Sequence, residues 1–268
     1  MNTRRQAQEL LDRHGVRPSR ALGQNFVVDP NTVRRIVRLA GIQPGDRVVE
    51  VGAGLGALTL ALAEAGARVT AVELDRHLIP VLDEVLDAAS PRPTVLHADA
   101  LQLDWPSVLS GASAWQLVAN LPYNVATPLV LDVLDDAPAV RGLLVMVQRE
   151  VAERLAAKPG TKAYGIPSVK VSYWAQAEIV GRVGPNVFLP KPRVESALVR
   201  IVRRAEPATS ADPDVLFALV RAGFGHRRKM LRGALAGLVD ADAFARAGIS
   251  PGARAEELSV VDWGRLAT

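Results

Sequence analysis

Four consecutive residues, Asn120, Leu121, Pro122 and Tyr123, combine groups that could act together on a planar base. The Asn120 side-chain carbonyl and the Leu121 backbone carbonyl could accept hydrogen bonds from an exocyclic amine and turn its lone pair toward an electrophile. Pro122 stiffens the turn because its ring fixes φ. The Tyr123 ring offers a stacking face, worth about 1–3 kcal/mol per base. The segment predicts a site that orients an adenine amine, although an isolated match would also fit an ordinary turn.

A second group of candidate residues begins with Gly52, Gly54 and Gly56, which follow a short apolar run. Glycine permits a tight strand-to-helix turn and lets a ligand approach the backbone. Glu73 ends the next apolar run, where a carboxylate can accept hydrogen bonds from both hydroxyls of a ribose. Asp99 ends the third run, within reach of an adenine amino group. Together these positions indicate a nucleoside-containing cofactor.

The spacing of the glycines separates two classes of cofactor. It is G-x-G-x-G rather than the G-x-G-x-x-G that cradles a dinucleotide pyrophosphate at a helix N-terminus. S-adenosylmethionine has no phosphate, and it carries a carboxylate, an amine and a sulfonium instead. A shorter loop with acids nearby suits S-adenosylmethionine better, so we expect this methyl donor.

These residues must be positioned by the elements around them, and the pattern alternates between strand and helix from Arg47 onward. Short apolar runs separated by amphipathic segments are typical of βαβ units around a mainly parallel sheet. We therefore expect an α/β fold with a Rossmann-like methyltransferase sheet. Further strands are expected at residues 168–176, 178–190 and 196–204, where antiparallel pairing is plausible.

Residues 207–213 resemble a linker, and the remainder of the chain has helical periodicity. We expect a catalytic domain over residues 1–206, including a basic N-terminal segment, and a small helical RNA-binding domain over residues 207–268. The region Phe217–Val239 contains no acid. Its cations are Arg221, Arg227, Arg228, Lys229 and Arg232. Such a region suggests a polyanionic partner, although a solvated helix face is the plainer interpretation.

The composition excludes several classes of protein. The 268 residues are 49% hydrophobic, enough for a substantial core, and no apolar run approaches the roughly 18 residues of a membrane-spanning helix. The chain has no cysteine, and its four histidines lack ligand spacing, so we expect no metal site. We predict a monomeric cytoplasmic protein without a membrane partner.

At these motifs the chain resembles the small-subunit ribosomal RNA adenine dimethyltransferases, the kasugamycin-sensitivity family. The shared motifs are "LGQNF" at Leu22–Phe26, "EVGAGLGALT" at Glu50–Thr59, "ELDR" at Glu73–Arg76, "ADAL" at Ala98–Leu101, "NLPYN" at Asn120–Asn124, "KAYGIPSV" at Lys162–Val169, "VFLPKPRVESALV" at Val187–Val199 and "FGHRRKMLRGAL" at Phe224–Leu235. The resemblance implies dimethylation of two adjacent adenines in a hairpin loop near the 3′ end of small-subunit ribosomal RNA, in an immature subunit late in assembly.

The resemblance also implies roles for individual residues. The residues that match the family's S-adenosylmethionine contacts are Gln24, Asn25, Val27, Gly52, Gly54, Glu73, Asp99 and Asn120. Leu121, Pro122 and Tyr123 match its target-base pocket, and Phe188 is expected as a second stacking wall. Arg227, Arg228, Lys229 and Arg232 are expected to contact RNA from a basic helix.

Two other functions remain open at this point. A related methyltransferase acts on large-subunit ribosomal RNA, gives macrolide-type resistance and shares the catalytic turn. A non-catalytic RNA-binding assembly factor could retain the fold and lose the chemistry. The "KAYGIPSV" motif and the basic segment favour the small subunit, and the intact Glu73, Asp99 and Asn120 favour an enzyme.

Overall fold

The computed structural model describes residues 3–268, which form two compact units. Unit 1 comprises the chain through Ala152 and the segment Glu178–Val202, and unit 2 comprises Glu153–Ala177 and Arg203–Thr268. The elements that lie mainly in unit 1 are α1 (Arg4–His14), β1 (Phe26–Val27), α2 (Pro30–Ala40), β2 (Arg47–Val51), α3 (Ala57–Glu64), β3 (Arg68–Glu73), α4 (Ile79–Leu86), β4 (Thr94–His97), η1 (Ala100–Gln102), α5 (Trp105–Val108), β5 (Trp115–Asn120), α6 (Ala126–Asp136), β6 (Val140–Gln148), α7 (Arg149–Leu155), β7 (Ala175–Val183), η2 (Pro185–Val187), β8 (Phe188–Leu189) and β9 (Ser196–Arg203). Those of unit 2 are α8 (Ile166–Trp174), α9 (Pro213–Gly225), α10 (Leu231–Ala234), α11 (Ala241–Ala247), η3 (Ala255–Glu257) and α12 (Val260–Leu266).

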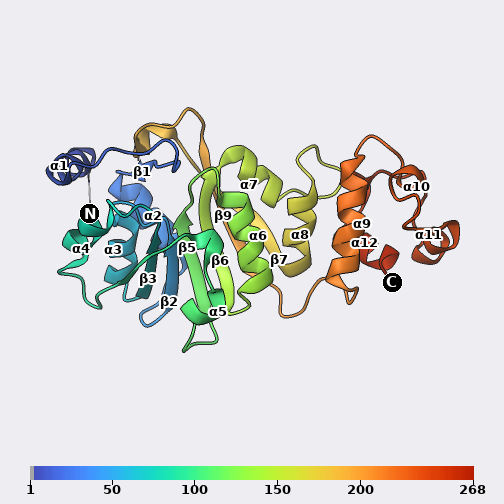
Figure 1. The fold of residues 1–268 in the computed structure, drawn as a ribbon, viewed down its shortest axis with the longest axis horizontal. Coiled ribbons are helices and arrows are strands. Elements are labelled where there is room, and N and C mark those ends of the chain that lie inside the picture. The colour runs from blue at the N-terminus through green and yellow to red at the C-terminus, as the bar shows by residue number, and fades with distance from the viewer. Residues whose placement is uncertain (1–2) are drawn as a thin grey trace. The chain divides into compact units, whose positions relative to one another are not determined.

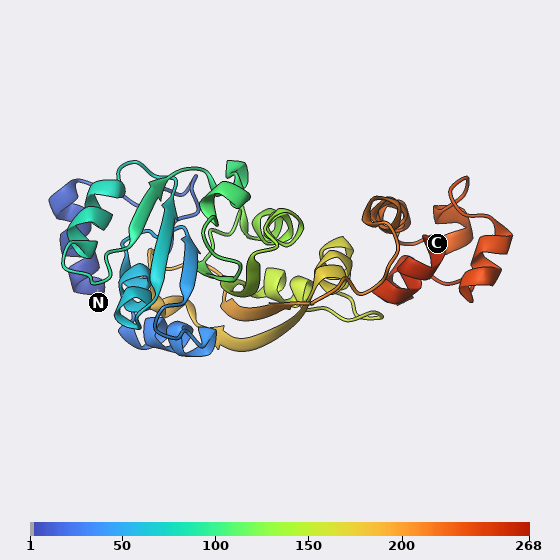
Figure 2. The ribbon, with the colours of Figure 1, turned by 90° about the horizontal axis from the view of Figure 1, so that it is seen from below.

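A seven-stranded sheet runs through unit 1 in the order β4-β3-β2-β5-β6-β9-β7 (Figure 1, Figure 2). The strands from β4 to β6 are parallel, and β9 is antiparallel to β6. This arrangement confirms the predicted α/β fold with a mainly parallel sheet. The carboxyl ends of β4, β3, β2 and β5 meet at one edge, where open α/β sheets bind their ligands.

One face of this sheet packs against α2 and α3. Val48 and Val69 of the sheet share a buried cluster with Ile36 of α2 and Leu62 of α3. Successive side chains of a strand point to opposite faces, so Glu50 lies on the same face as Val48. The Glu50 carboxyl is therefore buried beneath α3, and only 2% of the residue is exposed.

The prediction of a strand at residues 168–176 is wrong, because most of this segment lies in the helix α8. Gly165 precedes the helix, and its N–H donates to the Ser168 hydroxyl at 3.0 Å. Val169 and Tyr173 are four residues apart, which is a helical spacing, and both belong to the core that contains Phe217 of α9. The apolar residues of the segment suggested a strand, but the four-residue spacing of its buried side chains is that of a helix.

The extent of unit 2 differs from the expected division at residues 206/207. Its core takes in Tyr164 and Tyr173, which the expected boundary assigned to the first domain. The Tyr164 hydroxyl donates to the backbone carbonyl of Leu258 at 3.0 Å, so this segment is bound to the C-terminal helices. Within residues 3–268, no helix combines the length and apolar content needed to cross a membrane.

Candidate active site

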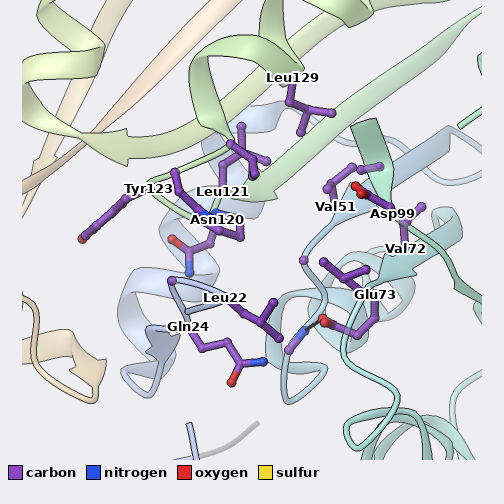
Figure 3. Close-up of a pocket in the computed structure, with 18 of the residues that line it drawn as sticks. Leu22, Gln24, Val51, Val72, Glu73, Asp99, Asn120, Leu121, Tyr123 and Leu129 are labelled. Atoms are coloured by element: carbon purple, nitrogen blue, oxygen red, sulfur yellow. Dashed lines mark hydrogen bonds between the residues drawn. The ribbon is translucent and has the colours of Figure 1, made fainter. Parts of the chain in front are cut away.

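Four positions that the sequence singled out lie at the carboxyl edge of the sheet. Glu73 ends β3, Asn120 ends β5, Gly52 follows β2 and Asp99 follows β4. All four line one pocket, together with the rest of the Asn120–Tyr123 turn. Figure 3 shows Glu73 and Asp99 on one side of this pocket and Asn120 and Tyr123 on the other. The strand order therefore brings the two groups of candidate residues together.

Two glycines of the loop between β2 and α3 line the pocket. Gly52 and Gly54 have φ angles of 75° and 58°, which residues with a side chain rarely adopt. A Cβ atom on Gly54 would lie 2.9 Å from the Phe26 ring, and one on Gly52 would lie 3.4 Å from Pro122. The absence of these side chains lets both the N-terminal segment and the Asn120–Tyr123 turn approach the loop.

The loop is held by Glu73. One carboxylate oxygen of Glu73 accepts the Gly54 N–H at 2.8 Å (Figure 3), and the other accepts the Asp75 N–H at 2.9 Å. Burial raises the pKa of Glu73, and these backbone donors oppose part of the increase. Each oxygen keeps a second lone pair, so the carboxylate can still accept a bond from a ligand.

Glu50 lies deeper, below the glycine loop. Burial raises its pKa to about 8, Thr59 opposes the increase and the charge of Glu73 adds to it. Neither Glu50 Oε2 nor Thr59 Oγ1 has a partner within hydrogen-bond geometry among the described residues, although the two groups are close enough to interact. Glu50 is therefore a buried acid that is protonated near neutral pH.

The Asn120–Tyr123 turn is fixed from both sides. The Asn120 Nδ2 donates to the Asn25 backbone carbonyl at 2.9 Å, which directs the amide so that its Oδ1 has no described protein partner. The Leu121 N–H donates to the Met146 carbonyl at 3.0 Å and extends the pairing of β5 with β6. Tyr123 is half-buried, and burial raises the pKa of its phenol.

The N-terminal segment forms one wall of the pocket. The Gln24 Nε2 donates to Asp75 at 2.8 Å, and Gln24 and Asn25 both line the pocket. Val27, expected at the cofactor, instead pairs with Phe188 in the short β1–β8 ladder and does not line the pocket. Phe26 lines it in its place, because its ring packs over Gly54.

Comparison with known proteins identifies the family. The Ribosomal RNA adenine dimethylase family matches residues 16–268. The chain belongs to this family. The dimethylase is 51% identical over 269 residues to the Ribosomal RNA small subunit methyltransferase A of Streptomyces coelicolor, an alignment that covers 97% of this chain and 93% of the relative. It is thus an enzyme that uses S-adenosylmethionine to methylate adenine in ribosomal RNA.

Two solved structures share the fold of the dimethylase. A dimethyladenosine transferase from Plasmodium falciparum has a TM-score of 0.76 at 22% identity, over 89% of this chain and 94% of that one. The 23S rRNA methyltransferase ErmE has a TM-score of 0.70 at 26% identity, over 90% of this chain and 98% of that one. Both likenesses agree with the predicted methyltransferase sheet.

Phe188 does not lie at the pocket, where it was expected to form a second stacking wall for the target base. Its side chain is fully buried in the cluster that contains Val183 and Leu198, and it does not line the pocket. Arg4 donates to the Phe188 carbonyl at 2.7 Å and holds the β8 strand in this position. In this conformation Phe188 is a core residue, and stacking on a base would require it to leave the core.

The basic segment of unit 2 is a turn rather than the expected helix. Helix α9 ends at Gly225 and α10 begins at Leu231, so Arg227, Arg228 and Lys229 lie between them. Arg227 is already engaged, since its Nε donates to Glu256 at 2.7 Å and its Nη2 to the Lys162 carbonyl at 2.9 Å. Arg228, Lys229 and Arg232 are exposed, and no described ion pair holds their side chains.

Two buried polar residues next to the predicted site, Asp75 and Ser196, are not among the site residues predicted from the sequence. Asp75, which is 9% exposed, accepts from Gln24 and caps the turn after β3 through the His77 N–H at 3.0 Å. Its place in the "ELDR" motif could have signalled this role. Ser196, which is 1% exposed, contacts the Tyr123 hydroxyl from β9, and nothing in the order of the sequence indicates that contact.

Proposed function

We propose that this dimethylase forms N6,N6-dimethyladenosine at two adjacent adenines in a hairpin loop near the 3′ end of small-subunit ribosomal RNA. The relative from Streptomyces coelicolor supports the small subunit at 51% identity, whereas the 23S rRNA methyltransferase ErmE is 26% identical. The complete pocket edge favours an enzyme over an assembly factor that has lost its chemistry. The observation that carries the proposal is that the Asn120–Tyr123 turn lines the same pocket as Gly52 and Glu73.

The cofactor residues are proposed from their places around that pocket. Those that line it are Gln24, Asn25, Gly52, Gly54, Glu73, Asp99 and Asn120, whereas Val27 lies outside it and is proposed from the family resemblance alone. When bound, S-adenosylmethionine supplies a methyl group on a positively charged sulfur. Glu73 accepts from the ribose hydroxyls, and Asp99 accepts from the adenine amine of the cofactor. Leu74 and Leu101, which line the pocket near these acids, offer apolar contact to the planar ring.

The target adenine is oriented by the turn. Asn120 Oδ1 and the Leu121 carbonyl accept the two hydrogens of its N6 amine, so the nitrogen lone pair turns toward the methyl group. These hydrogen bonds strengthen as positive charge develops on N6 in the transition state. Pro122 holds the backbone of the turn, and Tyr123 stacks on the base after it leaves its helix. Transfer would form the N6–CH3 bond and break the S–CH3 bond of the cofactor, which would leave as S-adenosylhomocysteine. The N6 ammonium so formed is acidic enough to lose its proton to water.

The RNA-binding role of residues 207–268 is proposed from charge. Arg228, Lys229 and Arg232 are exposed and unpaired within the described chain, as phosphate-binding cations must be, and Arg227 lies beside them. We further propose that the substrate is an immature small ribosomal subunit. The enzyme is proposed to act on it as a monomer in the cytoplasm. Native mass spectrometry of the free enzyme tests the monomer.

The role of the turn is tested with Asn120→Ala. We expect this variant to bind RNA as the wild type does and to transfer methyl at least about a hundredfold more slowly, as happens when a transition-state donor or acceptor is removed. Transfer from labelled S-adenosylmethionine to small subunits that lack the modification measures the rate. Asn186→Ala is the matched control, because Asn186 is exposed and lies outside the pocket. Undiminished transfer by Asn120→Ala would reject the catalytic role.

A further inference from the structure

The phenol end of Tyr123 is attached to a residue outside the catalytic turn. The Tyr123 hydroxyl and the Ser196 Oγ are 2.9 Å apart and form a hydrogen bond in which either group can donate. Figure 3 shows the hydroxyl end of Tyr123 pointing away from Glu73, so this bond lies on the side opposite the cofactor edge. The bond connects the turn after β5 to the start of β9.

Ser196 occupies a firmly held position. It is 1% exposed and pairs with Gln148 in the antiparallel β6–β9 ladder. The preceding residue, Glu195, accepts the Arg149 N–H at 3.0 Å through its carbonyl and the Arg149 Nη1 at 2.9 Å through its carboxylate. Because the β6–β9 ladder and the backbone bond from Arg149 to Glu195 both hold this backbone, the Ser196 hydroxyl has a fixed point of attachment.

The turn has its other anchor on the neighbouring strand. The Leu121 N–H donates to the Met146 carbonyl of β6, and Met146 pairs with Leu198 of β9. The backbone before Tyr123 and the hydroxyl at the far end of its ring are thus bound to adjacent strands of one ladder. A tyrosine side chain has two main rotatable bonds, and its hydroxyl oxygen lies on the axis of the second. Holding the backbone and the hydroxyl therefore fixes χ1 and with it the place of the ring.

We infer that Ser196 is a positioning residue, which holds the Tyr123 ring at the place where the target adenine stacks. This inference rests on the proposed function, because a fixed ring matters only if a base binds to it. Ser196 itself is buried and does not line the pocket. Its effect on the reaction is exerted through Tyr123, since a small misplacement of a reacting group slows transfer strongly.

A purely structural role makes a different prediction. A buried hydroxyl without a partner destabilises a protein, so the bond could serve only to satisfy Ser196. In that case its removal lowers the melting temperature and leaves kcat unchanged at saturating RNA and cofactor. Positioning instead lowers kcat while the affinity for S-adenosylmethionine stays the same, because the bond lies away from the cofactor edge.

The experiment compares kcat for Tyr123→Phe, Ser196→Ala and the double variant. We expect each single change to lower kcat by roughly tenfold, as expected when one hydrogen bond of ordinary strength no longer holds the ring. The double variant should be no slower than the slower single variant, because both changes remove the same bond. Wild-type kcat in Tyr123→Phe, or effects that multiply in the double variant, would overturn the inference.

Two further variants complete the test. Ser196→Thr keeps the hydroxyl and should recover much of the kcat that Ser196→Ala loses. Ser168→Ala is the matched control, because Ser168 is also fully buried, its hydroxyl donates to the Arg154 carbonyl at 2.6 Å, and it belongs to unit 2. It should lower stability without changing kcat. If Ser196→Ala fails to fold, Tyr123→Phe decides alone, since it preserves the ring.

Failure of this inference can be separated from failure of the proposed function. If the wild type transfers methyl to small-subunit adenines and Tyr123→Phe does so at the same kcat, only the positioning role is wrong. If the wild type transfers no methyl to those adenines, the proposed function itself is wrong.

Discussion

At the scale of single residues, the pocket is built by backbone hydrogen bonds that leave selected side-chain atoms unused. Asn120 uses its donor on the Asn25 carbonyl and retains its Oδ1, which is the atom that an adenine amine requires. Glu73 uses both oxygens to hold the loop and still has lone pairs for a ligand. Positioning and chemistry are thus divided between the two polar atoms of the Asn120 amide, and in Glu73 between lone pairs of the same oxygens.

The buried acid Glu50 should make stability depend on pH. Its pKa is about 8 in the folded protein, above the ordinary 4.5, so the native state holds a proton that the unfolded chain releases. The free energy of unfolding from this group therefore falls as pH rises from about 4.5 to about 8, by at most about 1.4 kcal/mol per pH unit. Glu50→Gln mimics the protonated acid and should flatten this decline. Denaturant titrations between about pH 5 and pH 8 measure it.

Glu64→Gln is the control for that measurement, because Glu64 is an exposed acid on α3, the helix that covers Glu50. It should retain the pH dependence of the wild type. An equally steep decline in Glu50→Gln would show that Glu50 is ionised in the folded protein.

The residues that could be predicted from the sequence are those whose position follows from a strand end. Glu73, Asp99 and Asn120 were placed correctly at one edge, because parallel strands align their carboxyl ends. Phe188 was not, since a motif does not reveal whether its aromatic side chain points to the pocket or to the core. Ser196 could not be anticipated, because its contact with Tyr123 depends on antiparallel pairing between strands distant in sequence.

At the scale of elements, the glycine loop and the N-terminal segment fit against each other. Gly54→Ala would place a Cβ 2.9 Å from the Phe26 ring and strain a φ of 58°. We expect the strain to lower stability by about 1–2 kcal/mol, together with weaker binding of S-adenosylmethionine as Phe26 is displaced. Thermal unfolding and calorimetric titration with the cofactor measure the two effects.

Gly41→Ala is the control that separates backbone strain from displacement of Phe26. Gly41 has a similar φ of 67°, but a Cβ atom added there would have nothing within 4 Å. It should lower stability by a similar amount and bind cofactor normally. Equal cofactor affinity in the two variants would mean that the fit between Gly54 and Phe26 does not shape the pocket.

We expect the cations of the basic turn to have different roles. Arg228 and Lys229 bind RNA, and Arg227 holds the turn through Glu256. Replacing Arg228 and Lys229 with alanine should reduce the log–log slope of RNA affinity against salt by roughly 0.7–0.9 for each phosphate that is no longer neutralised. Arg227→Ala breaks the ion pair with Glu256 and should cost less than about 1 kcal/mol in stability, because the pair is partly exposed. Binding titrations over a series of salt concentrations give the slopes.

Glu256→Gln is the matched control, since it breaks the same ion pair and leaves every cation in place. Its slope should equal that of the wild type. An unchanged slope in the Arg228 and Lys229 variant would show that the turn faces away from RNA.

The elements that were predicted wrongly have a common cause. Residues 168–176 and the basic segment around Arg228 are short, and their structure depends on the packing of unit 2 rather than on local preference. Packing of Tyr173 against Phe217, whose ring centroids are 5.4 Å apart, stabilises α8. The parallel strands, in contrast, carry a repeating signal over many residues, and their order at the pocket edge follows from it.

At the scale of the whole molecule, the chain combines a unit that holds the pocket with a unit that carries exposed cations. The pocket lies entirely within unit 1, and Arg228, Lys229 and Arg232 lie in unit 2. We therefore assign the chemistry on the target adenine to unit 1 and the binding of the RNA phosphate backbone to unit 2. Changes in the basic turn should affect RNA binding without altering the affinity for S-adenosylmethionine.

The adenines that receive the methyl groups decide whether the proposed function is right. Small ribosomal subunits that lack the modification are incubated with the enzyme and labelled S-adenosylmethionine, and the modified positions are mapped by primer extension. We predict that the label appears as N6,N6-dimethyladenosine at two adjacent adenines of the hairpin loop near the 3′ end of the RNA. Label at other positions, label only in large-subunit RNA, or no transfer at all would show that the proposed function is wrong.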